Sequence, residues 1–180
     1  ETLACRVICR AAADIGLHIE LEDAIASFVG HRDAENMRDI EGRLGRPLPP
    51  GFEDRLHEDL NAALRTALQP VDGARALVES VTVPRCVASS GRREKLELSL
   101  RLTGLRPLFG DRIFSAYDVG KWKPDPGLFL HAADAMGVDP AACAVVEDSD
   151  PGIEAGLAAG MTVFAYRPCG RAVPGGVTAV

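Results

Sequence analysis

From residue 70 onward the chain alternates short apolar runs with segments of helical spacing. The apolar runs cover residues 85–89, 112–116, 143–147 and 161–166, and the helical segments between them cover residues 92–103, 125–136 and 151–159. Runs of this length are typical of buried strands, and neighbouring parallel strands need a crossover, usually a helix, between them. The alternation therefore predicts an α/β fold, with a parallel sheet covered by helices.

Residues 1–69 contain only helical signals. Apolar residues recur at helical spacing over residues 1–15, 22–30, 33–45 and 52–69, and a break at Pro47, Pro49 and Pro50 precedes the last of these segments. The pattern changes at the "PVDG" of residues 70–73. We therefore expect a helical domain over residues 1–69 and an α/β domain over residues 70–180.

The composition limits the classes of partner. With 180 residues, of which 47% are hydrophobic, the chain can bury one sizeable core and one smaller module. Its net charge of -6 argues against nucleic acid or an acidic membrane, because such partners need a basic face. No apolar run approaches the roughly 18 residues that could cross a bilayer. A small molecule is the expected partner, and a monomer or weak dimer the expected state.

The cysteines indicate the redox compartment. There are five, an odd number, and they are scattered through apolar surroundings, which argues against a disulfide framework and favours a reducing cytoplasm. Cys5 and Cys9 lie one helical turn apart, but no further ligand pair accompanies them. We expect both to be buried as small apolar residues, and assign them no metal.

Three loops follow the predicted strands, at residues 88–94, 115–126 and 146–152. Ligands of open parallel sheets bind beyond the carboxyl ends of the strands, where such loops converge. The loops offer hydroxyls and a helix start at Ser89, Ser90 and Gly91, an ammonium at Lys123 before Pro124, and paired carboxylates at Glu147 and Asp148. Hydroxyls, backbone N–H groups and an ammonium hold phosphate, while carboxylates hold Mg²⁺. The set suits phosphoryl transfer with Mg²⁺ as cofactor.

Each of these groups also has a purely structural interpretation. Ser89 could cap a helix, and Lys123 could be an ordinary solvated lysine, with Lys121 competing for its role. Glu147 and Asp148 could be acids at a helix start, stabilised by the helix dipole. However, two adjacent acids directly after a buried strand repel each other unless a cation neutralises them, which favours the metal interpretation.

Two residues of the helical domain are candidates for substrate contact. His31 and Arg32 follow Gly30, whose freedom permits a sharp break between two helices. Arg32 could grip a substrate carboxylate in a bidentate fork, and His31 could bond hydroxyls. The alternative, that both are solvated residues at a helix start, stays open.

Three stretches of the α/β half resemble known motifs. They read "VASSG", "IFSAYDVGKWKPDPGLFLHAADAMGV" and "AVVEDSDPGIEAGLAAGMTVFAY". They are similar to the second, third and fourth motifs of the haloacid dehalogenase-like hydrolase superfamily, which has a Rossmann-like core. Within it, the chain resembles the group that holds β-phosphoglucomutase, phosphoglycolate phosphatase and 6-phosphogluconate phosphatase.

The resemblance implies roles for individual residues. Ser89 matches the phosphate-binding hydroxyl, Lys123 the lysine that steadies the phosphoryl group, and Asp148 with Glu147 the Mg²⁺-binding acids. Residues 1–69 match a helical cap that closes over the substrate. The implied activity is Mg²⁺-dependent hydrolysis of a small phosphorylated metabolite, such as a sugar phosphate or 6-phosphogluconate, through an aspartyl-phosphate intermediate. A phosphomutase with the same core is the alternative.

The sequence departs from the family at the first motif. The nucleophilic aspartate of the family lies in a DxDGT-like turn after the first strand, and no such segment occurs in this sequence, which begins without Met inside a helical pattern. We expect the first core strand, between the strands at 85–89 and 143–147, to be absent from this chain, either because the chain is a fragment or because residues are missing from the sequence. The chain as written should not turn over, which leaves a non-catalytic binding protein as a further alternative.

Overall fold

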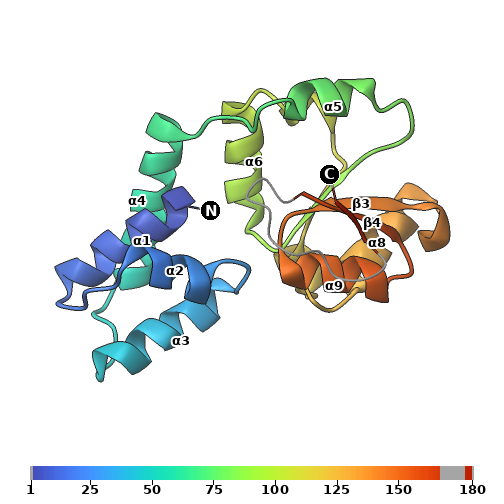
Figure 1. The fold of residues 1–180 in the computed structure, drawn as a ribbon. Helices are drawn as coiled ribbons and strands as arrows, with labels where there is room; N and C mark the ends of the chain where they lie inside the picture. Colours follow the sequence, from blue (N-terminus) through green and yellow to red (C-terminus); the bar gives the residue numbers. More distant parts are fainter. Residues whose placement is uncertain (1, 167–176, 180) are drawn as a thin grey trace.

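The computed structural model describes residues 2–166 and 177–179. The first part of the chain is all helical, and Figure 1 shows it to one side of the strands. Its helices are α1 (Thr2–Asp14), α2 (Leu21–Phe28), α3 (Asp33–Leu44) and α4 (Phe52–Ala67), and α1 packs against both α2 and α4. The four predicted helices are confirmed, each within two residues at either end. We refer to residues 2–67 as the helical region.

The helical region has its own apolar core. Cys5, Ala12 and Ile40 are almost completely buried, and aromatic and aliphatic side chains of α2 and α4 pack around them. The loops between helices turn through glycine, as at Gly45, which ends α3 with a φ of 71° that L side chains rarely adopt. Amphipathic helices joined by such short turns bury one apolar face each, which accounts for the compact core.

The rest of the chain, α5 to β5, is the α/β region. It contains α5 (Ala74–Ser80), β1 (Val87–Ser89), α6 (Arg93–Leu102), β2 (Ile113–Ser115), α7 (Ala116–Val119), α8 (Gly127–Met136), β3 (Ala144–Glu147), α9 (Asp150–Ala158), β4 (Thr162–Ala165) and β5 (Thr178–Ala179), with 3₁₀ turns at Arg106–Leu108 and Pro140–Ala142. The predicted alternation of strands and helices is confirmed. The sequence analysis missed α5, α7, β5 and both 3₁₀ turns, which are too short to show a period.

The strands form two parallel sheets rather than the single sheet expected. One pairs β1 with β2, with Val87 opposite Ile113, and the other has the order β3-β4-β5, with Ala144 opposite Thr162. Within residues 2–166 and 177–179, β1 and β3 are not hydrogen-bonded to each other. Helix α8 contacts β1, β2 and α9, and so joins the two sheets. The predicted absence of a strand between β1 and β3 remains a prediction.

One face of the β3–β4 sheet is packed and the other is open. Val145 and Val163 are buried beneath α8 and α9, whereas Val146 is 59% exposed on the opposite face. Helix α9 lies so close to the sheet that a Cβ atom at Gly156 would stand 2.7 Å from a methyl group of Val163. Only glycine permits that approach, so the "GLAAG" stretch has a packing role.

The structure shows the state of the cysteines and the hydropathy of the helices. Cys5, Cys9, Cys86 and Cys143 are free thiols, and Cys169 lies outside the described residues. Among the described helices none is both long and apolar enough to cross a membrane.

Candidate active site

The loops after β1 and β2 are tied together. The hydroxyl of Ser115, which is fully buried at the end of β2, donates a hydrogen bond of 2.7 Å to the carbonyl oxygen of Gly91. Ser89 ends β1, and its hydroxyl oxygen accepts a hydrogen bond of 3.2 Å from the Gly91 N–H. Ser89 is not the N-cap of the following helix, because α6 begins at Arg93 and its N-cap is Arg92. The capping interpretation of Ser89 is therefore wrong.

Ser90 presents a buried hydroxyl in the same loop. Its oxygen is shielded from solvent and has no hydrogen-bond partner among the described residues. A buried hydroxyl without a partner costs about 1–3 kcal/mol, so a native structure normally supplies a partner as water or ligand. The loop Ser89-Ser90-Gly91 thus has unused capacity for a ligand with hydrogen-bonding oxygens.

Lys123 and Glu147 form a buried ion pair. The Lys123 ammonium contacts Oε1 of Glu147, and the two side chains are 11% and 8% exposed. Oε2 of Glu147 accepts hydrogen bonds from the backbone N–H groups of Asp148, at 2.9 Å, and Ser149, at 3.4 Å. Burial acts to raise the pKa of Glu147, but the Lys123 charge and these donors outweigh it and hold the pKa below its ordinary value. Glu147 is therefore an anion that fixes Lys123.

A glycine makes room for this pair. A Cβ atom at Gly152, in the first turn of α9, would stand 2.0 Å from Oε1 of Glu147. Glu147 is the last residue of β3, whereas α9 begins at Asp150 with Ser149 as its N-cap. The interpretation of Glu147 as an acid of the helix start is therefore wrong, because its carboxylate belongs to the strand end.

Asp148 is the exposed member of the acidic pair. No group of three or more histidine, cysteine or acidic side chains able to hold a metal occurs in residues 2–166 or 177–179. Mg²⁺ is commonly bound by only one or two carboxylates, with water and phosphate oxygens as its other ligands. Asp148 fits as one such carboxylate ligand at the end of β3. Glu147 would have to release an oxygen from Lys123 or its backbone donors to act as a second.

A cleft of about 620 Å³ separates the two regions beside Lys123. The helical region lines it with Gly30, His31, Arg32 and Glu35, and the α/β region with the loop of residues 120–125 and Pro151. The structure therefore brings together His31, Arg32 and Lys123, which sequence analysis placed in one site. Ser89, Ser90, Gly91, Glu147 and Asp148 lie outside this lining.

Arg32 is engaged within its own helix start. Its Nε donates a hydrogen bond of 2.8 Å to Oε1 of Glu35, while its backbone N–H donates one of 3.0 Å to Oε2. Its guanidinium carbon lies 5.4 Å from the centre of the Trp122 ring across the cleft. His31 is exposed beside it, and Lys121 is half-exposed and paired with Asp125 at 3.4 Å. Arg32 thus stands at a helix start, as the alternative interpretation held, and also lines the cleft.

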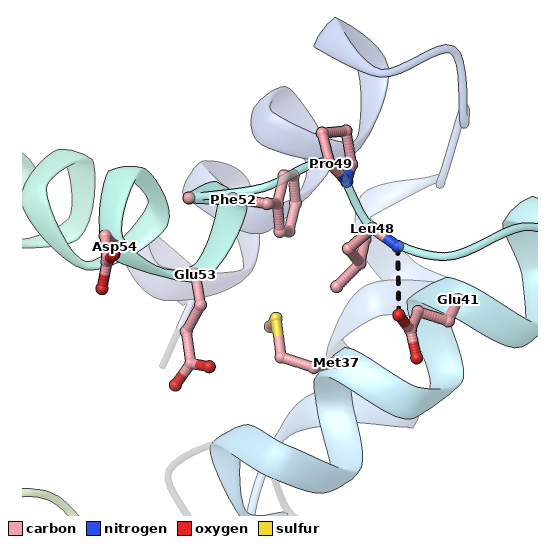
Figure 2. A pocket seen from close by; sticks show the side chains of 8 residues that line it. Met37, Glu41, Leu48, Pro49, Phe52, Glu53 and Asp54 are labelled. Carbon is pink, nitrogen blue, oxygen red and sulfur yellow. Dashed lines mark hydrogen bonds between the residues drawn. The ribbon is translucent and has the colours of Figure 1, made fainter.

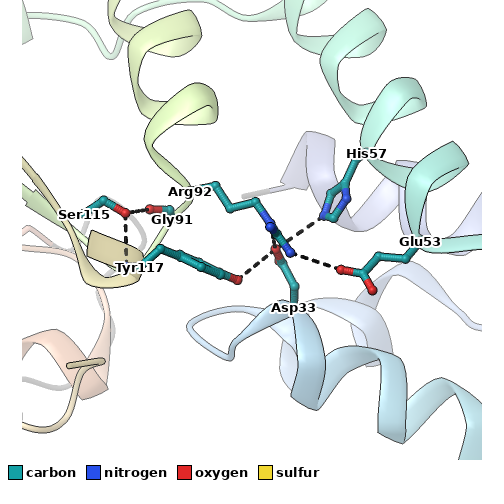
Figure 3. Close-up of polar contacts among 7 residues, drawn as sticks. All are labelled: Asp33, Glu53, His57, Gly91, Arg92, Ser115 and Tyr117. Atoms are coloured by element: carbon teal, nitrogen blue, oxygen red, sulfur yellow. Dashed lines mark hydrogen bonds and ion pairs between the residues drawn. The ribbon is translucent and has the colours of Figure 1, made fainter. Parts of the chain in front are cut away.

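A second polar cluster links the two regions, as Figure 3 shows. Oδ2 of Asp33 accepts hydrogen bonds of 3.1 Å from Nε of Arg92 and from the Tyr117 hydroxyl, and lies 3.4 Å from Nε2 of His57. Arg92 also pairs with Glu53 at 3.1 Å. The contact with His57 is the largest cause that lowers the pKa of Asp33, with Arg92 and Tyr117 adding to it against the effect of burial. Sequence analysis missed this cluster.

A smaller pocket of about 380 Å³ lies within the helical region. Figure 2 shows Met37, Leu48 and Phe52 around it, with the Leu48 N–H donating a hydrogen bond of 3.0 Å to Glu41. Met37 and Leu48 pack against the helical core, of which Phe52 is a part. Because no residue of the α/β loops lines this pocket, it is separate from the candidate site.

Comparison with known proteins places the chain in a family. A model of the haloacid dehalogenase-like hydrolases matches residues 5–160. The 6-phosphogluconate phosphatase of Escherichia coli K12 is 32% identical over 167 residues, which are 92% of this chain and 76% of that protein. The fructose-1-phosphate phosphatase YqaB of the same organism is 42% identical over 84 residues, 47% of this chain and 44% of that protein.

Solved structures agree. A haloacid dehalogenase family hydrolase of Deinococcus radiodurans R1, with bound phosphate and sodium, is 34% identical with a TM-score of 0.73, covering 97% of this chain and 77% of that one. A haloacid dehalogenase-like protein of Agrobacterium tumefaciens C58 is 30% identical with a TM-score of 0.81, covering 99% and 86%. The α/β fold and the resemblance inferred from the three motifs are confirmed. The chain therefore belongs to the haloacid dehalogenase-like hydrolases.

Proposed function

We propose that the protein is a Mg²⁺-dependent phosphatase that hydrolyses a small phosphorylated metabolite, a sugar phosphate or sugar-acid phosphate such as 6-phosphogluconate. The observation that carries the proposal is Lys123, a buried lysine that Glu147 holds in place and that lines the cleft between the two regions. A fixed ammonium beside a cleft neutralises phosphate oxygens without having to reorganise. The relatives named as phosphatases of 6-phosphogluconate and fructose-1-phosphate support this class of substrate.

The phosphate end of the substrate is assigned to the loops of the α/β region. The Ser90 hydroxyl is buried and lacks a partner among the described residues, so it can donate to a phosphate oxygen without giving up another bond. Ser89 holds the backbone of Gly91 and shapes the same loop. Lys123 supplies the charge that cancels repulsion between the phosphoryl group and an attacking carboxylate. The attack is expected to form the aspartyl-phosphate of the family, and the nucleophile is assigned to no residue of this sequence.

Asp148 is assigned as the metal ligand of this chain. It lies at the end of β3, in the turn whose backbone also binds Glu147. When bound there, Mg²⁺ would neutralise phosphate oxygens as a Lewis acid. Glu147 has the separate task of orienting Lys123, or shares the metal after releasing one of its present partners.

The helical region is assigned the role of a cap, and the cap and core correspond to residues 1–69 and 70–180. His31 and Arg32 face the cleft from its side. The Arg32 guanidinium has five N–H donors, and its two bonds to Glu35 leave others for a carboxylate or hydroxyl of the substrate. A polyhydroxy or sugar-acid phosphate suits such a surface better than an apolar ester does.

The test is phosphorus NMR of the full-length protein with Mg²⁺ and a panel of phosphate esters that includes 6-phosphogluconate, fructose 1-phosphate and glucose 6-phosphate. The proposal expects inorganic phosphate to accumulate from at least one sugar or sugar-acid phosphate, and to stop accumulating in excess chelator. Movement of the phosphoryl group between sugar positions without release would indicate a mutase instead. Binding of the esters without any reaction would indicate a non-catalytic protein.

A further inference from the structure

Trp122 is the only tryptophan of the sequence, and it lies directly before Lys123. Its side chain lines the cleft between the two regions. The indole nitrogen is shielded from solvent and has no hydrogen-bond partner within the described part of the chain. An indole N–H can only donate, and buried tryptophans usually find an acceptor for it. Among the described residues, the indole N–H therefore has no oxygen atom to which it donates.

Two side chains contact the Trp122 ring. The Arg32 guanidinium lies 5.4 Å from the ring centre, at cation–π distance. The Tyr117 ring lies nearly perpendicular to it, with centres 5.4 Å apart and an interplanar angle of 82°. Tyr117 is itself anchored by its hydrogen bond to Asp33. The indole thus contacts a residue of the helical region and a residue of the α/β region.

Because Trp122 lines the cleft, a molecule bound there is the candidate for the missing acceptor. Arg32 and Lys123 line the same cleft, so the surroundings favour an oxygen-rich, anionic molecule. Lys123 is next to Trp122 in the chain and is the residue assigned to phosphate. An oxygen of the organic part of the substrate is therefore the acceptor that the indole can meet.

We propose that Trp122 is a specificity-determining residue, whose indole N–H donates to a hydroxyl or carboxylate oxygen on the organic part of a phosphorylated polyol or sugar acid. The inference rests on the proposed function and names the group that distinguishes such substrates from small phosphate esters. Esters without an oxygen at that position leave the N–H unpaired, and sites built around a hydrogen bond discriminate against ligands that lack it.

The variant Trp122→Phe separates the hydrogen bond from the ring. Phenylalanine keeps an aromatic face for Arg32 and an edge for Tyr117 but has no N–H. In the full-length enzyme we expect the KM for 6-phosphogluconate to rise about tenfold, as the loss of one hydrogen bond predicts, with kcat/KM for p-nitrophenyl phosphate changed less than about twofold. Equal changes for both substrates, or none for either, would overturn the proposal.

Fluorescence provides a readout that does not depend on turnover. The Trp122 emission of the full-length wild type, isolated by subtracting the Trp122→Phe spectrum or by assignment if other tryptophans are present, is titrated with 6-phosphogluconate and with inorganic phosphate. A saturable change with 6-phosphogluconate that phosphate alone does not reproduce supports the contact, even if no ester is hydrolysed and the proposed function fails. Hydrolysis of 6-phosphogluconate with an unchanged Trp122 spectrum at saturation would contradict it.

Discussion

The helical and α/β regions bury different kinds of residue. In the helical region the fully buried positions are apolar, such as Ala12, Ala24 and Ile40, and Asn36 is its one buried polar residue among those described. In the α/β region the buried polar residues are Ser115 and Glu147, and both stand at the carboxyl ends of strands. Burying a polar group costs free energy unless it is paired. The α/β region therefore buries polar groups where its loops meet, in spite of the free-energy cost. This indicates that the chemistry takes place there and that the helical region shapes the substrate-binding cleft.

The largest expected effect comes from removing the assigned metal ligand. Asp148→Ala in the full-length protein should abolish phosphate release and leave the fold in place, because Asp148 is exposed and its loss leaves no buried cavity. Phosphate release, circular dichroism and the thermal midpoint would be measured together. Asp139→Ala, in the exposed turn that precedes β3, is the control. Activity retained in Asp148→Ala, or undiminished by a chelator, would contradict the metal assignment.

The second-largest expected effect distinguishes the roles of two neighbouring lysines, Lys123 and Lys121. Lys123→Ala should lower kcat by about 10³-fold, because the ammonium is fixed by Glu147 beside the cleft. Lys121→Ala should change kcat by less than about threefold, because Lys121 is 55% exposed and pairs with Asp125 at the surface. Lys123→Ala also leaves the buried carboxylate of Glu147 unpaired, which could unfold the protein. The double variant Lys123→Ala/Glu147→Gln removes that charge and so shows whether activity is lost without a loss of folding. A larger loss in Lys121→Ala would show that the roles are reversed.

A smaller effect tests the shaping role of the helical region. Arg32→Ala should raise the KM for the preferred sugar phosphate about tenfold and that for p-nitrophenyl phosphate less than about twofold, because only the larger substrate reaches the helical side. Arg38→Ala is the control, since Arg38 lies on α3, which Arg32 directly precedes, and bonds only the Ala34 carbonyl in the described structure. Steady-state kinetics would measure both. A similar rise in KM for Arg38→Ala would mean that the positive charge near α3 affects substrate binding, rather than a contact between Arg32 and the substrate.

The link between the regions should have a modest effect on stability. Asp33→Asn weakens bonds to Arg92, Tyr117 and His57, but Asp33 is 39% exposed, so we expect a loss of only about 1 kcal/mol. Asp39→Asn is the matched control, because Asp39 lies on the same helix and pairs with Arg43 inside the helical region. Denaturant unfolding would compare the two variants. If Asp39→Asn lowers the free energy of unfolding as much as Asp33→Asn does, the contact between the two regions does not contribute more to stability than a contact within one region.

The smallest effect is the dependence of this link on pH. The folded-state pKa of Asp33 is lowered, so its stabilising contribution is present above the ordinary carboxyl pKa of about 3.9 and is lost as the pH falls through the folded-state value. The difference in thermal midpoint between wild type and Asp33→Asn should therefore shrink as the pH falls below about 4. A difference that grows below pH of about 4 would contradict the assignment of the charged form.

The sequence was informative where periodicity or chain order determines structure. The helices other than α5 and α7, and the strands β1 to β4, follow from the spacing of apolar residues. The loops of Ser89, Lys123 and Glu147 follow from the rule that strand ends carry ligands. The Lys123–Glu147 pair was not foreseen, because the cation expected beside Glu147 was a metal. Lys123 is 24 residues away from Glu147, and nothing in the sequence near either residue indicates that they pair.

The contacts between the two regions were beyond sequence reasoning. Asp33 meets Arg92 and Tyr117, which are 59 and 84 residues away, and a single sequence holds no record of such pairings. Arg92 could have been suspected, since it follows Ser89-Ser90-Gly91 directly. Trp122 could have been suspected too, as the one tryptophan in the loop of Lys123. Strand periodicity does not specify which strands pair, so it gave no sign that the strands divide into two sheets. The expected absence of a strand between β1 and β3 agrees with this division.

One ratio tests whether the α/β region binds the phosphate while the helical region recognises the rest of the substrate. It is kcat/KM for 6-phosphogluconate, or the preferred sugar phosphate, divided by kcat/KM for p-nitrophenyl phosphate, measured for wild type, Ser89→Ala and Arg32→Ala. If the α/β loops bind phosphate and the helical region reads the rest of the substrate, Ser89→Ala lowers both terms and preserves the ratio. Arg32→Ala then lowers the ratio about tenfold. A ratio that falls in Ser89→Ala and is unchanged in Arg32→Ala would contradict the account.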